Sequence, residues 1–578
     1  MARLMHGHHR LAITTPGTWR SKKMANENKV MFPIDEPVDF VIVGSGSAGG
    51  ILAKELSTNG FKVVVLEQGP FRTAKDFTHD ELSVSNFGEL LGGGSDVHQQ
   101  TFRDDESKEA TLGQPQPAEY AQTVGGSSVH FTANFWRFRE SDFMERSLLG
   151  PISGTNFADW PISYAELEPY YAKVDWEIGV SGAPGPNDAF RSKPFPMPPM
   201  PVKSSGVLLE RGARKLGLNA QPAPLAILSQ PLNDRPACIN CGFCMGFGCE
   251  ANAKSSTLAA MIPLALASGN CEIRAECAVF RIETNADGRA DEVLYYDPEG
   301  NERSQKARAV IVSANGAETS RLLLNSASDA YPDGLANSSG FVGRNLMYNG
   351  HSIANALFEH QLNDFKGVQV TRIIHDFYES DPARGFYGGG GIDARPLFAA
   401  TPIFFAAYGG DPDGPAWGAE YKNNLAHDFT RHMAILGSTT SLALDRNNVS
   451  IDPTHKDRWG RPSLRITYKD HDDDMQIAKF LQDRAMELLD AAGAEKAWRD
   501  HIGYQNTGAH LLGTCRMGND AQTSVVDQYH RTHDVPNLFL CDGSSFVTSG
   551  RGQPTMTIMA LAFRAAEHIG AAAKNNEI

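Results

Sequence analysis

Residues 38–50 read VDFVIVGSGSAGG, and this stretch decides the fold of the chain. Its first half is rich in Val and Ile and predicts a buried strand, while residues 51–56 begin a helical pattern. A G-x-G-x-x-G run lies between the two. Gly44 allows a tight turn, Gly46 lets a pyrophosphate approach the backbone, and Gly49 lets the helix pack on the strand. We therefore expect a Rossmann-type dinucleotide site.

A second predicted strand supports this expectation. Residues 62–67 are KVVVLE and end in Glu67, which is placed to accept hydrogen bonds from an adenosine ribose. The helix between the two strands would face the phosphates with free N–H groups and the positive end of its dipole. Any tight strand-to-helix turn can contain such glycines, but here strand, helix and acid occur together. The motif by itself does not distinguish NAD from FAD.

Length and composition indicate a globular protein with a large core, since the 578 residues are 41% hydrophobic and 21% charged. A net charge of −15 argues against a nucleic-acid-binding protein. No apolar run is long enough to span a bilayer, so we expect no transmembrane segment. Residues 1–36 are polar and basic and lack the apolar core of a secretory signal. We expect a disordered extension there, with Met24 as an alternative start.

The middle of the chain gives mostly structural signals. Ser163 and Glu166 predict a capping box at a helix start, and residues 184–201 form a proline-rich connector. Residues 351–500 contain Gly- and aromatic-rich runs, among them 404–408, which suit strands and loops around a pocket. Further expected elements are helices over 204–216, 255–268, 318–325 and 473–492, and strands over 271–283, 292–297 and 309–313.

The C-terminal segment contains the strongest chemical pattern. His510 stands before a Gly-Thr turn, and a later buried strand ends in Asp542-Gly543. Pro554-Thr555 then begins a final apolar helix, with Pro at its favoured first position. Free N–H groups at that helix start would attract an anion such as a reduced flavin. If all this forms one site, the N-terminal glycine fingerprint and the C-terminal segment must meet in space.

From Val38 to the C-terminus the chain resembles the glucose-methanol-choline (GMC) oxidoreductase family, because several separate motifs agree in order. Besides the fingerprint, these are Gly125-Gly126-Ser127-Ser128 with Arg137 and Asp142-Phe143, Ala317-Glu318-Thr319 with Arg321-Leu322-Leu323, Gly343-Arg344-Asn345-Leu346, and the closing His510, Arg516-Met517-Gly518, Asp542-Gly543 and Pro554-Thr555. The resemblance implies that the dinucleotide is FAD. The double glycine at 125–126 and Ser127 would let backbone lie flat against the planar ring, although a β-turn between strands gives the same pattern.

The resemblance also assigns catalytic roles. His510 matches the base that faces flavin N5 and takes the alcohol proton as hydride leaves the carbon; imidazole suits this task because its pKa lies near neutrality. A lone histidine would more often be a core residue. The family usually has Asn or His where this chain has Gln553, which can hydrogen-bond a substrate hydroxyl but cannot act as a second base. His130 looks like the histidine that pyranose 2-oxidase links covalently to the flavin; we expect a non-covalent contact.

Four of the eight cysteines fall within residues 238–249, spaced C-x2-C-x2-C-x4-C: Cys238, Cys241, Cys244 and Cys249. Such thiolates on a turn-rich loop suit an iron–sulfur cluster, while tetrahedral zinc and disulfides are the alternatives. The other four are scattered, and we expect them to be small buried apolar residues: Cys271, Cys277, Cys515 and Cys541.

The cysteine loop, with Ala253-Lys254-Ser255-Ser256 after it, resembles the same region in large subunits of gluconate, fructose and glucose dehydrogenases. In the latter two a three-iron cluster relays electrons from the flavin, so the resemblance implies a 3Fe-4S or 4Fe-4S cluster here. It also implies a small export-competent partner subunit and a haem or quinone electron acceptor. Co-export with such a partner favours a periplasmic location over a cytoplasmic one.

Taken together, these features predict an α/β (α+β overall) fold with a Rossmann-type FAD-binding domain and a substrate domain built on a mostly antiparallel sheet. The expected division is an extension (1–36), a discontinuous FAD domain (37–350), a substrate domain (351–504) and a C-terminal return with the catalytic residues (505–578). The expected activity is an FAD-dependent dehydrogenase oxidising a CH–OH group of a sugar, polyol or sugar acid. The alternatives are an O2-using sugar or alcohol oxidase with structural cysteines, and a non-catalytic electron-transfer subunit.

Overall fold

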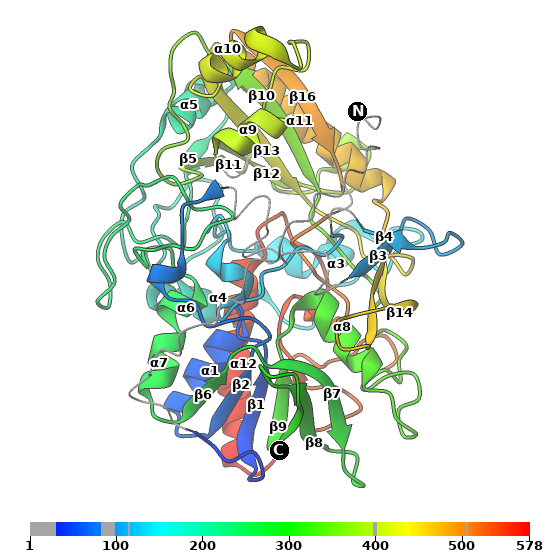
Figure 1. Cartoon of the computed structure of the whole chain (residues 1–578). Coiled ribbons are helices and arrows are strands. Elements are labelled where there is room, and N and C mark those ends of the chain that lie inside the picture. Colours follow the sequence, from blue (N-terminus) through cyan, green and yellow to red (C-terminus); the bar gives the residue numbers. More distant parts are fainter. Residues whose placement is uncertain (1–30, 82–98, 114–115, 397–400, 505–506) are drawn as a thin grey trace.

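The computed structural model describes residues 31–81, 99–113, 116–396, 401–504 and 507–578. The expected N-terminal extension falls mostly outside these residues. Two large sheets dominate the described part, one at the bottom and one at the top of the view in Figure 1, with a smaller sheet at the side. The predicted combination of a Rossmann-type sheet with a mostly antiparallel one is confirmed.

The seven-stranded sheet contains the predicted nucleotide unit. Its order is β6-β2-β1-β9-β8-β7, with β17 also paired to β9. The pairs β1–β2, β1–β9, β2–β6 and β9–β17 are parallel, whereas the pairs β7–β8 and β8–β9 are antiparallel. The strands are β1 (Val38–Val43), β2 (Val63–Leu66), β6 (Cys271–Arg274), β7 (Ala278–Thr284), β8 (Ala290–Tyr296), β9 (Glu302–Val312) and β17 (Leu538–Leu540).

Helices cover this sheet, so β1, β2 and the last four residues of β9 are almost wholly buried and consist mainly of Val and Ile. Helix α1 packs against both α12 and α7, and α12 packs against α4 (Figure 1). The helices of this half are α1 (Gly49–Thr58), α3 (Glu145–Leu149), α4 (Tyr164–Val174), α6 (Thr257–Ala260), α7 (Ile262–Ala267), α8 (Asn315–Asn325) and α12 (Thr555–Lys574). Short helical turns are η1 (Ala74–Asp76), η2 (Gly126–Val129), η3 (Glu140–Phe143), η4 (Asp175–Gly179) and η6 (Gly543–Ser545).

The six-stranded antiparallel sheet has the order β16-β10-β13-β12-β11-β5. Helix α11 packs on it and against α5. Its strands are β5 (Ala220–Pro222), β10 (His351–Leu357), β11 (Arg372–Ile374), β12 (Gly390–Arg395), β13 (His432–Thr439) and β16 (Lys496–Ile502). The helices of this half are α5 (Ser204–Leu216), η5 (Pro382–Arg384), α9 (Pro402–Tyr408), α10 (Gly418–Asp428) and α11 (Asp472–Ala492).

A third, four-stranded sheet joins distant parts of the chain in the order β14-β15-β3-β4. Its strands are β3 (Gln100–Arg103), β4 (Thr111–Leu112), β14 (Asn448–Lys456) and β15 (Pro462–Thr467). None of the described helices has the length and apolar character needed to cross a bilayer. The predicted capping box is present, because the Glu166 N–H donates to Ser163 Oγ and the Glu166 carboxylate accepts from the Ser163 N–H.

Three local predictions were wrong. The strand expected over 271–283 is two strands, because the chain turns at Glu276 (φ 57°) to leave a parallel pairing with β2 and enter an antiparallel one with β8. The helix expected over 255–268 breaks at Met261, just before Pro263, whose ring and missing N–H prevent a continuous helix. The run 404–408 lies in helix α9, which begins at Pro402 and is capped by the Thr401 side chain.

Candidate active site

One cavity lies between the glycine fingerprint and the C-terminal segment. It brings together most of the residues predicted to bind the cofactor, with the predicted base: Gly44, Gly46, Glu67, Gly126, Ser127, His510, Asp542, Gly543, Pro554 and Thr555. Gly49, Gly125, His130 and Gln553 are not part of its lining. The two ends of the chain therefore meet in one site, as the single-site hypothesis requires.

The fingerprint glycines are needed for close backbone packing. Gly44 has φ +90°, and a Cβ there would lie 2.5 Å from the carbonyl oxygen of Ser313. A Cβ on Gly49 would lie 2.0 Å from the Gly44 carbonyl oxygen, so only glycine lets α1 begin so close to β1. A Cβ on Gly126 would lie 2.7 Å from the Gly46 Cα, which shows that the two predicted glycine motifs touch.

Glu67 supports the shape of this loop. Its Oε2 accepts hydrogen bonds from the Ser45 N–H (3.0 Å) and hydroxyl (2.7 Å), and Oε1 accepts one from the Gly69 N–H (2.9 Å). Burial raises the pKa of Glu67. Since each carboxylate oxygen can accept two hydrogen bonds, Oε1 can still accept one from a ribose hydroxyl.

The C-terminal segment is held to α8 by Asp542. Its Oδ2 accepts hydrogen bonds from the Asn315 N–H (3.0 Å) and the Thr319 hydroxyl (2.6 Å), and Oδ1 accepts from the Ser544 N–H (2.7 Å). Helix α12 begins at Thr555 and lines the cavity with its first turn. That helix start offers free N–H groups to an anion, as predicted.

His510 is positioned by a residue that sequence reasoning missed. Its Nδ1 lies 3.0 Å from Asn349 Oδ1. The Asn349 amide nitrogen donates to the carbonyl oxygens of Thr439 (3.1 Å), Ser549 (3.2 Å) and Gly550 (3.3 Å), which fixes Oδ1 toward the histidine. Because Oδ1 can only accept, His510 Nδ1 carries the proton and Nε2 keeps its lone pair. Burial lowers the pKa of His510 to about 4, so the ring is neutral at pH 7.

The start of β10 and the end of β13 in the antiparallel sheet approach the same place. His351 lies 5.9 Å from His510 between ring centroids, and it pairs with Ser438 across β10 and β13. Gln553 Nε2 donates to Ser438 Oγ at 3.5 Å, a long hydrogen bond. Gly552 is needed here, because its φ is +113° and a Cβ would lie 2.3 Å from the Ser438 Cβ. The substrate-orienting role of Gln553 remains a prediction.

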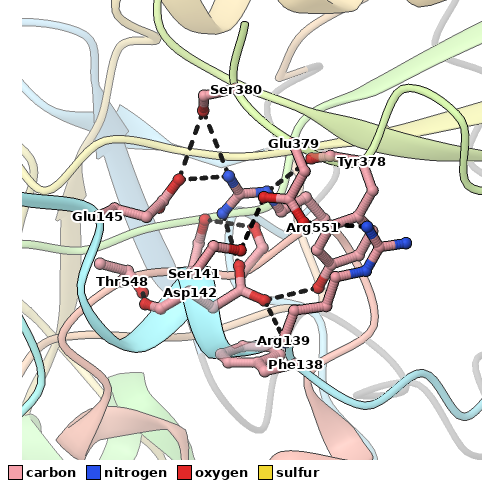
Figure 2. A network of polar contacts seen from close by, with 12 residues as sticks. Phe138, Arg139, Ser141, Asp142, Glu145, Tyr378, Glu379, Ser380, Thr548 and Arg551 are labelled. Atoms are coloured by element: carbon pink, nitrogen blue, oxygen red, sulfur yellow. Dashed lines mark hydrogen bonds and ion pairs between the residues drawn. The ribbon is translucent and has the colours of Figure 1, made fainter. Parts of the chain in front are cut away.

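A buried ionic network fixes the loop that contains Gln553 (Figure 2). Arg551 forms ion pairs with Asp142 (2.5 Å) and Glu145 and donates to the Tyr378 carbonyl oxygen (2.9 Å). The Tyr378 hydroxyl donates to Asp142 Oδ2 (2.7 Å), and the Tyr387 hydroxyl donates to Glu145 Oε2 (2.8 Å). Burial raises the pKa of Asp142 to about 6 although Arg551 opposes this. Three segments far apart in sequence are thereby held together.

His130 lies at the end of η2, away from the cavity lining. It is buried, its Nδ1 has no hydrogen-bond partner among the described residues, and burial lowers its pKa to about 3. Its carbonyl oxygen accepts a hydrogen bond from the Gly246 N–H (2.7 Å). The histidine therefore marks a contact between η2, which lines the cavity, and the cysteine loop. The non-covalent flavin contact stays a prediction.

The four clustered cysteines line a second, smaller cavity together with His79, Phe243 and Lys254. None of the cysteines is in a disulfide. Backbone N–H groups point at two of the sulfurs, from Asn240 to Cys238 Sγ (3.4 Å) and from Lys254 to Cys249 Sγ (3.5 Å).

The four cysteines are the donors that either predicted metal group would use. In the described part of the chain, no three His, Cys, Asp or Glu side chains converge closely enough to hold one metal ion. Tetrahedral zinc needs four sulfurs about 2.3 Å from a single point, whereas a cluster distributes its thiolates over several iron atoms. Four cysteine sulfurs around one small cavity, with N–H groups directed at two of them, fit the donor set of an iron–sulfur cluster, which stays a prediction.

Comparisons with known proteins agree with this geometry. Family models described as GMC oxidoreductase match residues 38–350 and 443–562. The 2-methyl-1,2-propanediol dehydrogenase of Mycolicibacterium austroafricanum is 33% identical, over 92% of this chain and 95% of that protein. The fructose dehydrogenase large subunit of Gluconobacter japonicus is 29% identical, over 92% and 97%. A solved structure of Aspergillus oryzae formate oxidase matches with a TM-score of 0.62 and 16% identity, over 93% and 99% of the chains.

Two of the three fingerprint glycines, Gly46 and Gly49, should differ in the cost of substitution. Gly49→Ala is expected to lower the free energy of unfolding by about 1–3 kcal/mol, because its Cβ meets backbone. At Gly46 the nearest atom to a Cβ is 3.9 Å away, so Gly46→Ala should unfold within about 0.5 kcal/mol of the parent and yet bind FAD more weakly. Urea unfolding without added FAD and an FAD titration measure the two effects. Equal loss of stability in both variants would contradict this account.

Arg551→Met is expected to lower the free energy of unfolding by about 3–5 kcal/mol, because two buried carboxylates lose their cation. The control is Arg303→Met, which removes an exposed guanidinium paired with Asp297 (2.9 Å) and should cost no more than about 1 kcal/mol. Chemical unfolding curves of both variants provide the comparison. Similar losses for the two would show that the network does not hold the loop.

Proposed function

Because the chain belongs to the GMC oxidoreductase family, we propose that it is a dehydrogenase that oxidises a CH–OH group of a sugar, polyol or sugar acid to a carbonyl. FAD is its cofactor, and the proposed relay is an iron–sulfur cluster that passes electrons to an external acceptor. The observation that carries the proposal is the neutral His510–Asn349 pair at a cavity shared with the glycine fingerprint.

His510 would act as the base. Its Nε2 holds a lone pair, since Nδ1 donates to Asn349, and a neutral imidazole can accept the hydroxyl proton as the C–H bond breaks. The fingerprint glycines, Glu67 and the first turn of α12 would hold the cofactor. When bound, FAD supplies the hydride acceptor at N5 of its ring. Gln553 would orient the substrate hydroxyl from the opposite segment.

The preference for a dehydrogenase over an oxidase rests on two observations. The two curated relatives described above, 33% and 29% identical, are named dehydrogenases, whereas the formate oxidase described above is 16% identical. The cysteine loop also contacts the segment that lines the cavity, through the Gly246 N–H and the His130 carbonyl oxygen. Cys238, Cys241, Cys244 and Cys249 would hold the cluster, which supplies one-electron transfer when bound.

The proposal extends to partners and location. One relative is named a large subunit, which supports an assembly with a small partner and a haem or quinone acceptor. We further propose a periplasmic location reached by co-export with that partner, with the cytoplasm as the alternative. Fractionation of cells that produce the chain with and without the partner distinguishes the two.

The central test is anaerobic flavin bleaching against a panel of sugars, polyols and sugar acids, combined with iron analysis. The parent should bleach with at least one substrate, and His510→Asn should bleach about 10²–10⁴ times more slowly while keeping its FAD. His360→Asn on the exposed surface is the matched control and should behave as the parent. Bleaching without iron and with rapid O2 consumption would indicate the oxidase instead. Failure of every substrate to bleach the flavin would favour a non-catalytic electron-transfer subunit.

The pH profile gives a second test of the base. Protonation of His510 removes the lone pair, so kcat/KM should fall as the pH drops through a pKa below the usual 6.5. In Asn349→Asp a carboxylate would stabilise the imidazolium and raise that pKa, so activity should be lost at a higher pH than in the parent. Steady-state rates between pH 4 and 9 measure the acid limb of kcat/KM in the parent and in the variant. If kcat/KM of Asn349→Asp fell at the same pH as in the parent, the assignment of His510 as the base would be wrong.

A further inference from the structure

One of the residues that line the cysteine cavity is a buried lysine. Lys254 is 2% exposed and is the one lysine that is fully buried among the described residues. Its Nζ donates to the carbonyl oxygens of Cys244 (2.6 Å), Phe247 (2.8 Å) and Phe131 (3.1 Å). No carboxylate in the described part of the chain pairs with it, so its charge has only neutral acceptors.

Arg235 repeats this pattern nearby. It is 9% exposed, and it donates to the Ile178 carbonyl oxygen (2.7 Å) and to Ser255 Oγ (3.2 Å). No ion pair to a described carboxylate is formed. Most other buried guanidiniums in the described part of the chain do have such partners: Arg137 with Glu168 and Asp175, Arg321 with Glu318 and Asp457, Arg395 with Asp393, and Arg551 with Asp142 and Glu145. Arg516 is an exception, since it donates only to the carbonyl oxygens of Thr523 (2.9 Å) and Asn156 (2.7 Å).

Two buried cations without an anion are costly, because an unpaired charge loses its hydration and gains no compensating attraction. Glu250 lines the same cavity but forms no ion pair with Lys254, so the remaining groups of the lining that can become anionic are the cysteines. Lys254 lines the same cavity as all four cysteines, and its backbone N–H points at Cys249 Sγ (3.5 Å). As thiols they are neutral, whereas as metal ligands each is a thiolate. The missing anion therefore appears when the metal group is bound.

We infer that Lys254, assisted by Arg235, is the built-in counter-cation of an anionic iron–sulfur cluster held by the four cysteines. The inference rests on the proposed function. Reduction adds one electron, supplied by the reduced flavin, and makes the cluster more negative, with no bond or proton exchanged with the lysine. A fixed cation stabilises the reduced form more than the oxidised one, so it raises the reduction potential and favours retention of the cluster.

The experiment compares full-length, FAD-loaded Lys254→Met and Lys254→Arg with the parent. Met removes the charge at similar length, and a redox titration followed by electron paramagnetic resonance should show the equilibrium shifted about tenfold toward the oxidised cluster, ~59 mV for one electron. Iron and acid-labile sulfide per FAD should also fall. Lys254→Arg keeps the charge and should stay near the parent value, while Lys422→Met on the exposed surface of α10 is the matched control.

The possible results distinguish a failure of the proposed cluster from a failure of the counter-cation role of Lys254. A parent protein without iron would overturn the proposed cluster itself. A parent with iron, together with a folded Lys254→Met variant of unchanged potential and iron content, would overturn the counter-cation alone. If Lys254→Met does not fold, Arg235→Met takes its place and must lower the potential in the same direction. An unchanged potential in that variant would also overturn the inference.

Discussion

The short parallel pairing of β17 with β9 is the constraint on which the site depends. Leu538, Phe539 and Leu540 lie beside Val310, Ile311 and Val312, and the Cys541 N–H donates to the Val312 carbonyl oxygen (2.9 Å). Strand β9 also pairs with β1, so strands from the beginning (β1), the middle (β9) and the end (β17) of the chain have their carboxyl ends on the same side of the sheet. Loops that leave the carboxyl ends of neighbouring parallel strands form a common crevice. The fingerprint and the His510 segment share a cavity for this reason.

The Arg551 network performs a different task from the strand pairing. Strand pairing sets where the C-terminal segment enters the cavity, but it does not determine the path of residues 549–553. The buried guanidinium anchors that path to η3 and α3 through Asp142 and Glu145, and to the residue-378 loop through Tyr378. A buried ion pair contributes little net stability compared with apolar packing, yet loss of one partner is costly. Such a network therefore specifies one geometry more than it adds stability.

Local chemistry explains what could be predicted from sequence. The Val-rich strands, the fingerprint, the Ser163–Glu166 cap and the cysteine spacing depend on residues a few positions apart, so their pattern is visible in one dimension. The Asn349–His510 contact spans 161 positions, and the amide orientation depends on three carbonyl groups from two further segments. No local pattern marks Asn349. The turn at Glu276 was missed for a related reason, because it depends on strand partners 208 residues upstream in β2 and 6 to 18 residues downstream in β8.

The two cavities contain different polar groups, a neutral amide beside His510 and a lysine beside the cysteines. This difference follows from the chemistry proposed for each cavity. The base must be neutral before it acts, so His510 is buried beside an amide that fixes one tautomer and carries no charge. A carboxylate in place of the Asn349 amide would raise the pKa of His510, so that the imidazole would already be protonated at neutral pH. The cysteine cavity has the opposite requirement, because negative charge collects there with each bound thiolate. A buried cation suits that cavity and would be harmful beside His510, where it would oppose proton uptake. Under the proposed function, proton transfer would take place at His510 and electron transfer at the cysteine cavity, where Lys254 lies.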